Sequence, residues 1–148
     1  TKLLIIGVEH PDYRYEGTEN VLIIKNAPHP AVMGAMSKCR FLVVPSICAE
    51  SASTVAREAM SQRKAVIASD IGGLKEAVVD GETGILVPPG DAEKLADALS
   101  YLLQSPETAS RMGESGYKRL AENYTADDVI PRIIEVYQSL LLNKGQTV

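Results

Sequence analysis

Five short apolar runs set the strongest limit on what this chain can fold into. They are Lys2–Gly7, Val21–Lys25, Phe41–Val44, Ala65–Ser69 and Gly84–Val87. Each run is continuously apolar rather than alternating, which is typical of a strand buried on both faces. The helix-like stretches between these runs are Pro30–Lys38, Ala52–Arg63 and Leu74–Val79. Strands that alternate with helices predict an α/β fold, in which a parallel sheet has helices on both faces.

The last third of the chain has the pattern of helices alone. Asp91 is the expected N-cap of a helix over Ala92–Leu103, and Ser105 and Thr125 are the expected caps of two more. The third helix carries an apolar stripe, which we expect to be core of this domain or of one outside the chain: Ile130, Ile133, Ile134, Tyr137, Leu140 and Leu141. Residues 143–148 form a polar tail.

Composition narrows the function classes. The 148 residues, 45% of them apolar, suffice for one domain with a core, and no apolar run reaches the roughly 20 residues of a membrane span. A net charge of −4 gives no general attraction to nucleic acid, so any phosphate must be held by a local device. Cys39 and Cys48 fit no metal spacing and are interpreted as reduced thiols of a cytoplasmic protein. Thr1 leads directly into a strand, which predicts a fragment of a longer polypeptide.

A ligand site is expected at one edge of the sheet, because ligands of parallel sheets bind outside the carboxyl ends of the strands. The loops that should meet there are Val8–Pro11, Asn26–Pro30, Pro45–Ser51 and Asp70–Gly73. One of these loops carries Glu50 and leads into a helix that carries Glu58. Free N–H groups at the start of that helix suit phosphate, and two nearby carboxylates suit hydroxyls. A ligand with both kinds of group is a nucleotide sugar.

Glu58 and the two histidines have plainer interpretations as well. Glu58 lies off the helix face that Val55, Ala59 and Met60 are expected to bury, where a solvated glutamate would also lie. His10 and His29 each precede a proline, and we interpret them as turn residues without a recognisable partner.

The acidic pair and its surroundings resemble the retaining nucleotide-sugar glycosyltransferases of family 4. Their donor-binding domain carries an E-x(7)-E signature, whose spacing Glu50 and Glu58 have. The other stretches that match the family's motifs are Pro45-Ser46, Glu58-Ala59-Met60, Val66–Glu76 and Asp80–Asp91. The likeness covers almost the whole chain. It implies a Rossmann-like sheet that forms the C-terminal half of a GT-B fold, with residues 1–148 as one donor-binding domain.

The resemblance also implies roles for the site residues. Glu58 would bind the donor ribose, and Glu50, the catalytic candidate, would position the transferred sugar without acting as a nucleophile. Backbone amides of Ala52, Ser53 and Thr54 would hold the diphosphate. The donor base would lie against the loop formed by Lys25, Asn26, Ala27 and Pro28. Gly72 and Gly73 would form a supporting loop.

The implied activity is that of a hexosyltransferase that uses a nucleoside-diphosphate sugar, without a cofactor or an obligatory metal. The acceptor, a glycan, a lipid or a small molecule, would bind an N-terminal domain outside this chain. That domain, with a strand–helix unit carrying the phosphate-binding Arg and Lys, lies upstream in the family. The isolated fragment is therefore expected to be inactive.

Departures from the family pattern leave alternatives open. Ala52 and Ser53 stand where the family has an aromatic and a glycine, and Arg63 and Ala65 replace a glycine and a proline. A degenerate domain with a regulatory or assembly role is one alternative, and a GT-B sugar-nucleotide epimerase is another. A dinucleotide-dependent dehydrogenase is disfavoured, because the first strand ends without G-x-G-x-x-G.

Overall fold

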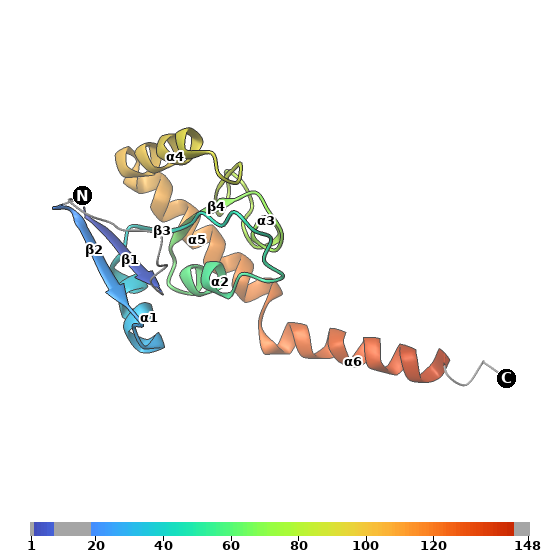
Figure 1. Cartoon of the computed structure of the whole chain (residues 1–148). Helices are drawn as coiled ribbons and strands as arrows, with labels where there is room; N and C mark the ends of the chain where they lie inside the picture. The colour runs from blue at the N-terminus through green and yellow to red at the C-terminus, as the bar shows by residue number, and fades with distance from the viewer. Residues whose placement is uncertain (1, 8–18, 144–148) are drawn as a thin grey trace.

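The computed structural model describes residues 2–7 and 19–143 (Figure 1). The expected site loop Val8–Pro11, His10 and the tail after Asn143 lie outside the described residues. The elements are, in chain order, β1 (Leu3–Gly7), β2 (Val21–Lys25), α1 (His29–Lys38), β3 (Phe41–Val44), α2 (Thr54–Ser61), β4 (Ala65–Ser69), α3 (Leu74–Ala77), β5 (Gly84–Val87), α4 (Ala92–Gln104), α5 (Pro106–Asn123) and α6 (Ala126–Asn143).

All five predicted strands are present, and every strand pair is parallel. β1 pairs with β2 from Leu3–Val21 to Gly7–Lys25. β4 lies between β3 and β5 in a second sheet. The α/β class is therefore confirmed. The strands form two sheets rather than one, because β1 and β3 do not pair within the described part of the chain.

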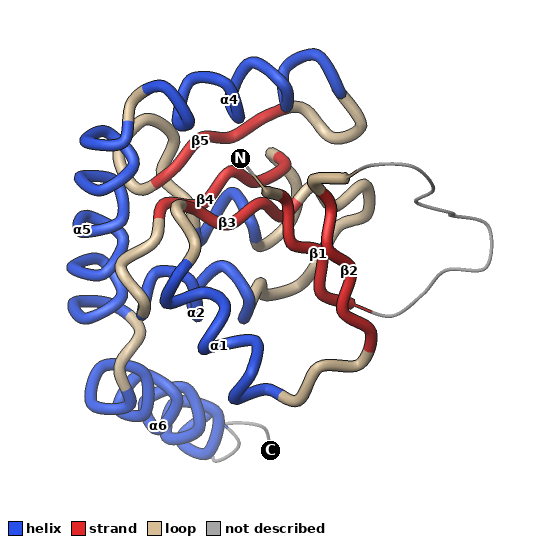
Figure 2. The backbone as a smooth tube through the Cα atoms, turned by 90° about the vertical axis from the view of Figure 1, so that its left-hand side faces the viewer, coloured by secondary structure: helices blue, strands red, loops and turns tan. Residues whose placement is uncertain are grey.

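β4 is the centre of the larger sheet. All five of its residues are buried, and alternate side chains point to opposite faces. Val66 and Ala68 pack in a core with α2 and α3, whereas Ala65 and Ile67 pack in a core with α4 and the first half of α5. Figure 2 shows α4 along β5, with α1 and α2 on the opposite side of the strands. The prediction that this strand is buried on both faces is confirmed.

The smaller sheet does not meet that prediction. Five of its large apolar side chains are between 36% and 58% exposed, namely Leu3, Leu4, Leu22, Ile23 and Ile24. The faces of this sheet are therefore partly open to solvent, and the sheet is hydrogen-bonded to no third strand among the described residues.

The predicted helix caps are present, with one difference. The Asp91 carboxylate accepts a hydrogen bond from the Lys94 amide at 2.9 Å, and the Thr125 hydroxyl accepts one from the Asp128 amide at 3.3 Å. Ser105 occupies the N-cap position of α5, but its side chain makes no capping hydrogen bond. Pro106 at the start of α5 has no N–H to be capped, so the first turn depends less on this side chain.

α6 extends away from the other elements (Figure 1). Its predicted stripe does not pack on this domain and is exposed, from 48% at Ile134 to 70% at Leu141. No helix in the described residues is long and apolar enough to cross a membrane.

α5 passes very close to the backbone before β4. A β-carbon on Gly113 would lie 2.1 Å from the carbonyl oxygen of Arg63. Arg63 itself has a φ of 56°, in the left-handed region where glycine is favoured. Its guanidinium lies 3.7 Å from the centre of the Tyr117 ring and is paired with Glu114, both on α5. Arg63 therefore adopts a backbone conformation favoured by the family's glycine, while its side chain contacts α5.

We predict that Gly113→Ala lowers the free energy of unfolding by about 1–3 kcal/mol, because the new methyl group would overlap the Arg63 carbonyl. The matched control is Gly34→Ala in α1, where a β-carbon would have no neighbour within 4 Å. That change should raise stability by about 0.5–1 kcal/mol, since alanine is the better helix former. Urea unfolding measures both. Equal effects of the two changes would contradict the close contact.

Candidate functional site

The loop between β3 and α2 carries the first predicted carboxylate. Glu50 is half-buried, and its Oε1 accepts a hydrogen bond from the Ser46 hydroxyl at 2.5 Å. The two residues lie on opposite arms of the loop. This hydrogen bond therefore holds the Glu50 carboxylate over the carboxyl end of β3.

The two predicted supporting glycines lie directly against this loop. The Gly73 amide donates a hydrogen bond to the Glu50 carbonyl oxygen at 2.7 Å. A β-carbon on Gly72 would lie 2.6 Å from that same oxygen, and one on Gly73 would lie 2.8 Å from the Ser51 carbonyl oxygen. Only glycine permits this approach of the two backbones. The loop after β4 thus fixes the backbone of the Glu50 loop.

The start of α2 follows at once. Ser53 is the N-cap, 1% exposed, and its hydroxyl accepts a hydrogen bond from the Ala56 amide at 3.4 Å. Within residues 2–7 and 19–143, the amides of Ala52, Ser53 and Thr54 donate no hydrogen bond to another residue. Free amides at the positive end of a helix attract an anion. The predicted diphosphate contacts are therefore chemically suitable, and their role stays a prediction.

Glu58 lies on the outer side of α2. The buried face of the helix consists of Ala56, Ala59 and Met60. The expectation that Val55 belongs to this face is wrong, because Val55 is 41% exposed and Ala56 is fully buried in its place. The Glu58 side chain is 28% exposed, which leaves its carboxylate accessible to a ligand.

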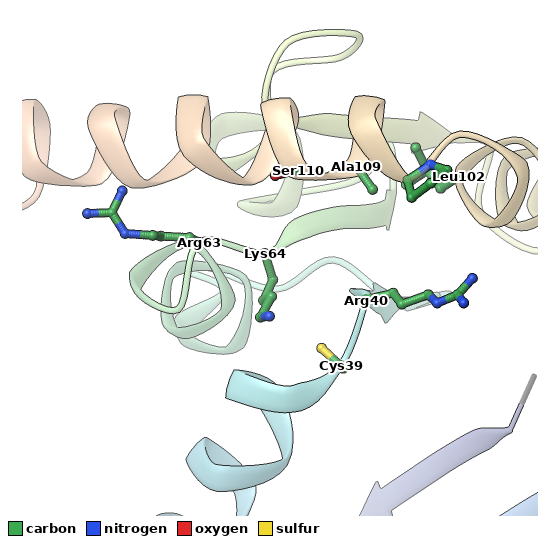
Figure 3. A pocket seen from close by; sticks show the side chains of 8 residues that line it. Cys39, Arg40, Arg63, Lys64, Leu102, Ala109 and Ser110 are labelled. Atoms are coloured by element: carbon green, nitrogen blue, oxygen red, sulfur yellow. The ribbon is translucent and has the colours of Figure 1, made fainter.

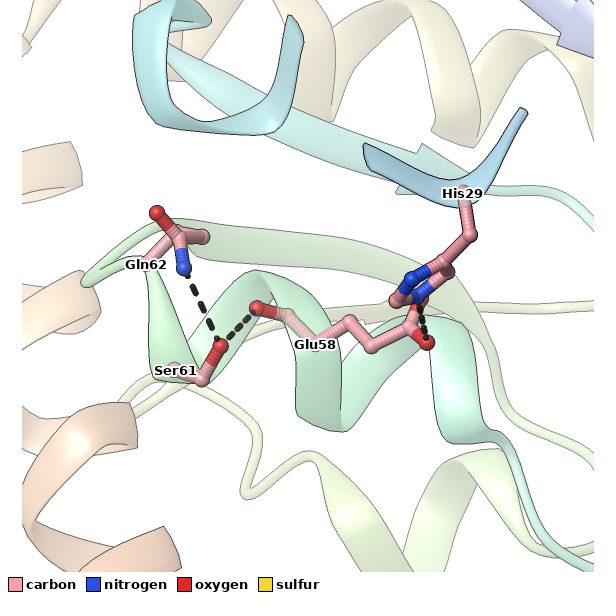
Figure 4. A network of polar contacts seen from close by, with 4 residues as sticks. All are labelled: His29, Glu58, Ser61 and Gln62. Atoms are coloured by element: carbon pink, nitrogen blue, oxygen red, sulfur yellow. Dashed lines mark hydrogen bonds and ion pairs between the residues drawn. The ribbon is translucent and has the colours of Figure 1, made fainter. Parts of the chain in front are cut away.

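The predicted base-proximal loop comes next to Glu58 in space. Asn26 has a φ of 53°, a conformation that asparagine tolerates, and its amide donates to the Gly7 carbonyl oxygen at 3.2 Å. Pro28 is the N-cap of α1, whose first residue is His29. The His29 Nε2 atom lies 2.9 Å from Glu58 Oε1 (Figure 4). This contact brings the start of α1, directly after the loop 25–28, against the glutamate of α2.

His29 is the residue whose partner the sequence pattern did not reveal. Its partner is 29 positions away, on a helix that neither motif nor periodicity connects to it. The sequence signal for His29 was its place within the predicted site loop Asn26–Pro30. Its contact with Glu58 places it beside the candidate site.

The described residues also form a cavity at the other end of the strands. Its volume is about 270 Å³, and its lining includes Arg40 and Lys64, which directly precede β3 and β4. Figure 3 shows the Arg40 and Arg63 side chains extending in opposite directions. None of the predicted site residues lines this cavity, so it is separate from the edge that carries Glu50. Among the described side chains, no three His, Cys, Asp or Glu groups could together hold a metal ion.

The family model described as glycosyl transferases group 1 matches residues 1–119. An uncharacterized glycosyltransferase of Methanocaldococcus jannaschii is 32% identical over 135 residues, which are 85% of this chain and 38% of that protein. The D-inositol 3-phosphate glycosyltransferase of Kribbella flavida is 36% identical over 115 residues, 74% of this chain and 27% of that protein.

Solved structures show the same architecture. Sucrose-phosphate synthase from Thermosynechococcus elongatus has a TM-score of 0.83 and 29% identity, covering 96% of this chain and 39% of that one. Anabaena HepE in complex with UDP-glucose has a TM-score of 0.74 and 21% identity, covering 82% of this chain and 33% of that one. The chain thus spans less than two-fifths of the length of each of these proteins.

We predict that Gly72→Ala destabilises the protein by about 1–3 kcal/mol more than Gly81→Ala. Both glycines have positive φ, 51° and 73°, so both changes carry the same backbone cost. Only at Gly72 would the methyl group meet the Glu50 backbone. Urea unfolding gives the difference, and the Glu50 amide resonance should shift only in Gly72→Ala. Equal destabilisation would show that the two loops are not in contact.

We predict that iodoacetamide modifies Cys48 faster than Cys39 in the folded protein. Burial raises the pKa of the Cys39 thiol, and the nearby Lys64 charge lowers it only in part, so less reactive thiolate is present. Cys48 is exposed, and both thiols are free. Peptide mass spectrometry at several times measures both rates. The difference should vanish in urea, and equally fast modification of Cys39 in the native protein would contradict its burial.

Proposed function

The chain belongs to the glycosyl transferases of group 1, and we propose that it forms the donor-binding domain of a retaining hexosyltransferase. The substrate is a nucleoside-diphosphate sugar, and the product carries the sugar on an acceptor. The observation that carries this proposal is the free N-terminus of α2, which lies between the Glu50 loop and the outward-facing Glu58.

In this proposal each part of the site binds one part of the donor. The amides of Ala52, Ser53 and Thr54 hold the diphosphate, and Glu58 accepts hydrogen bonds from the ribose hydroxyls. The base lies against the loop 25–28, which His29 connects to Glu58. Glu50, held by Ser46, accepts hydrogen bonds from the transferred sugar. Anabaena HepE has been solved in complex with UDP-glucose and with UDP, which supports this class of donor.

In the proposed reaction the protein forms no covalent bond with the sugar. The bond between the anomeric carbon and the diphosphate breaks, and the electron pair leaves with the diphosphate. Fixed N–H dipoles at the start of α2 stabilise that growing negative charge without reorganisation. The acceptor hydroxyl forms its bond on the same face of the sugar and passes its proton to the oxygen of the departing diphosphate. We assign Glu50 a positioning role in this step and route no part of it through a metal.

We further propose that the complete enzyme contains a segment beyond residues 1–148 that covers the open surfaces. The support is the edges of β1 and β3, which pair with no further strand among residues 2–7 and 19–143, together with the exposed side chains of β1 and β2 and the exposed stripe of α6. A parallel strand between β1 and β3 would join the two sheets. The acceptor site would lie in that additional part, so the isolated chain should bind donor weakly and transfer no sugar.

A non-catalytic domain and a sugar-nucleotide epimerase remain alternatives that we do not favour. Arg63 precedes the amino end of β4, whereas the site loops follow the carboxyl ends of the strands. The arginine there adopts a glycine-like backbone conformation. It therefore gives no reason to expect a lost donor site. The two free thiols support a cytoplasmic location, where cysteines stay reduced.

The test is a titration of the ¹⁵N-labelled chain with UDP-, GDP- and ADP-sugars. We predict that one of them shifts the amide resonances of Ser53, Thr54 and Glu58. Glu58→Ala should weaken this binding at least tenfold, because each lost hydrogen bond to a charged group contributes about 1.5 kcal/mol. The control is Glu135→Ala, on the exposed side of α6. The absence of shifts at these residues with all three donors would refute the proposal.

A further inference from the structure

His29 and Glu58 form a contact between two helices that are far apart in the sequence. The imidazole Nε2 of His29 lies 2.9 Å from Oε1 of Glu58, and the two side chains are 67% and 28% exposed. Figure 4 shows the His29 ring above the end of the Glu58 side chain. An ionised carboxylate only accepts hydrogen bonds, so Nε2 carries the hydrogen and donates it to Glu58.

The backbone around His29 is unusually stiff for the start of a helix. Pro28 and Pro30 flank it, and each proline ring fixes its own φ. The Ala31 amide donates to the Pro28 carbonyl oxygen at 2.8 Å, which closes the first turn. The histidine side chain has only two rotatable bonds. The first turn of α1 therefore holds the backbone of His29, and only these two bonds determine where its ring lies.

Glu58 has the opposite character. Its side chain has three rotatable bonds, one more than that of His29, and it is 28% exposed beside the buried face of α2. A flexible carboxylate loses rotamer freedom when it binds two hydroxyls, and this entropy cost weakens binding. The hydrogen bond from His29 fixes one oxygen beforehand. It leaves Oε2 and part of Oε1 free to accept hydrogen bonds from a ligand.

We propose that His29 is a positioning residue, which holds the Glu58 carboxylate in the orientation that receives the ribose hydroxyls of the donor. The inference rests on the proposed function, because it deepens the role of Glu58. His29 directly follows the loop 25–28, so the same contact keeps the base-proximal loop and the ribose-binding carboxylate in a fixed relation. His29 acts through Glu58 and need not touch the ligand.

The test compares nucleotides with and without ribose hydroxyls. UDP, GDP and ADP are first titrated into the wild-type chain by calorimetry, and the one that binds is used with its 2′,3′-dideoxy analogue. His29→Ala should weaken binding of the ribonucleotide about three- to tenfold, the loss of one restraining hydrogen bond. Binding of the dideoxy analogue should not change. His29→Gln, whose amide also donates, should restore part of the loss.

The control variant is Ser37→Ala, at the other end of α1, where the exposed hydroxyl donates to the Gly34 carbonyl oxygen of the same helix. It should leave both affinities unchanged. A purely structural effect of His29→Ala would weaken both nucleotides equally, and this result would overturn the inference.

Two further outcomes separate this inference from the function on which it rests. If Glu58→Ala removes the preference for ribose hydroxyls and His29→Ala does not, the inference is wrong and the proposed function stands. If the wild-type chain binds none of the three nucleoside diphosphates, the proposed function fails, and the inference fails with it.

Discussion

Burial of β4 on both faces organises the molecule. Its alternate side chains belong to two cores, so the strand cannot shift without opening both. The turn after Ser69 is fixed by this strand, and its two glycines lie against the Glu50 backbone. The candidate site is thus built on the most buried element of the fold. Contacts between the backbones of these two loops hold the Glu50 loop in place. Its carboxylate and amides therefore have defined positions although they lie near the surface.

The strands could be predicted from the sequence because each is a continuous apolar run with a polar or glycine boundary. Burial could not be predicted equally well. β1 and β4 have similar apolar patterns, yet Leu3 is 49% exposed and Ile67 is fully buried. The difference lies in what neighbours each strand, and composition carries no information about it. The same reason explains α6, whose apolar stripe predicts a partner without showing where that partner is.

Parts of the candidate site could likewise be predicted from the sequence, and other parts could not. Motif spacing identified Glu50 and Glu58, and turn chemistry identified Gly72, although the reason for that glycine is the backbone of another loop. The contact between His29 and Glu58 depends on how α1 packs against α2, which no local pattern encodes. Val55 was misplaced because periodicity defines a helix face only to within about one residue, and Ala56 is the position that meets the sheet.

The two ends of the strands in the larger sheet differ in what they contribute to the structure. At the starts of β3 and β4, Arg63 and Gly113 bring α5 against the backbone, and this edge determines how the helices pack. At the carboxyl ends, polar side chains and free amides project from loops. Arginine in place of the family's glycine at position 63 is therefore accommodated at the amino end of β4, where its side chain packs on α5. β4 is buried on both faces between these two ends, so the geometry at the carboxyl ends is retained. A departure from the family pattern at position 63 therefore does not imply a change at the candidate site.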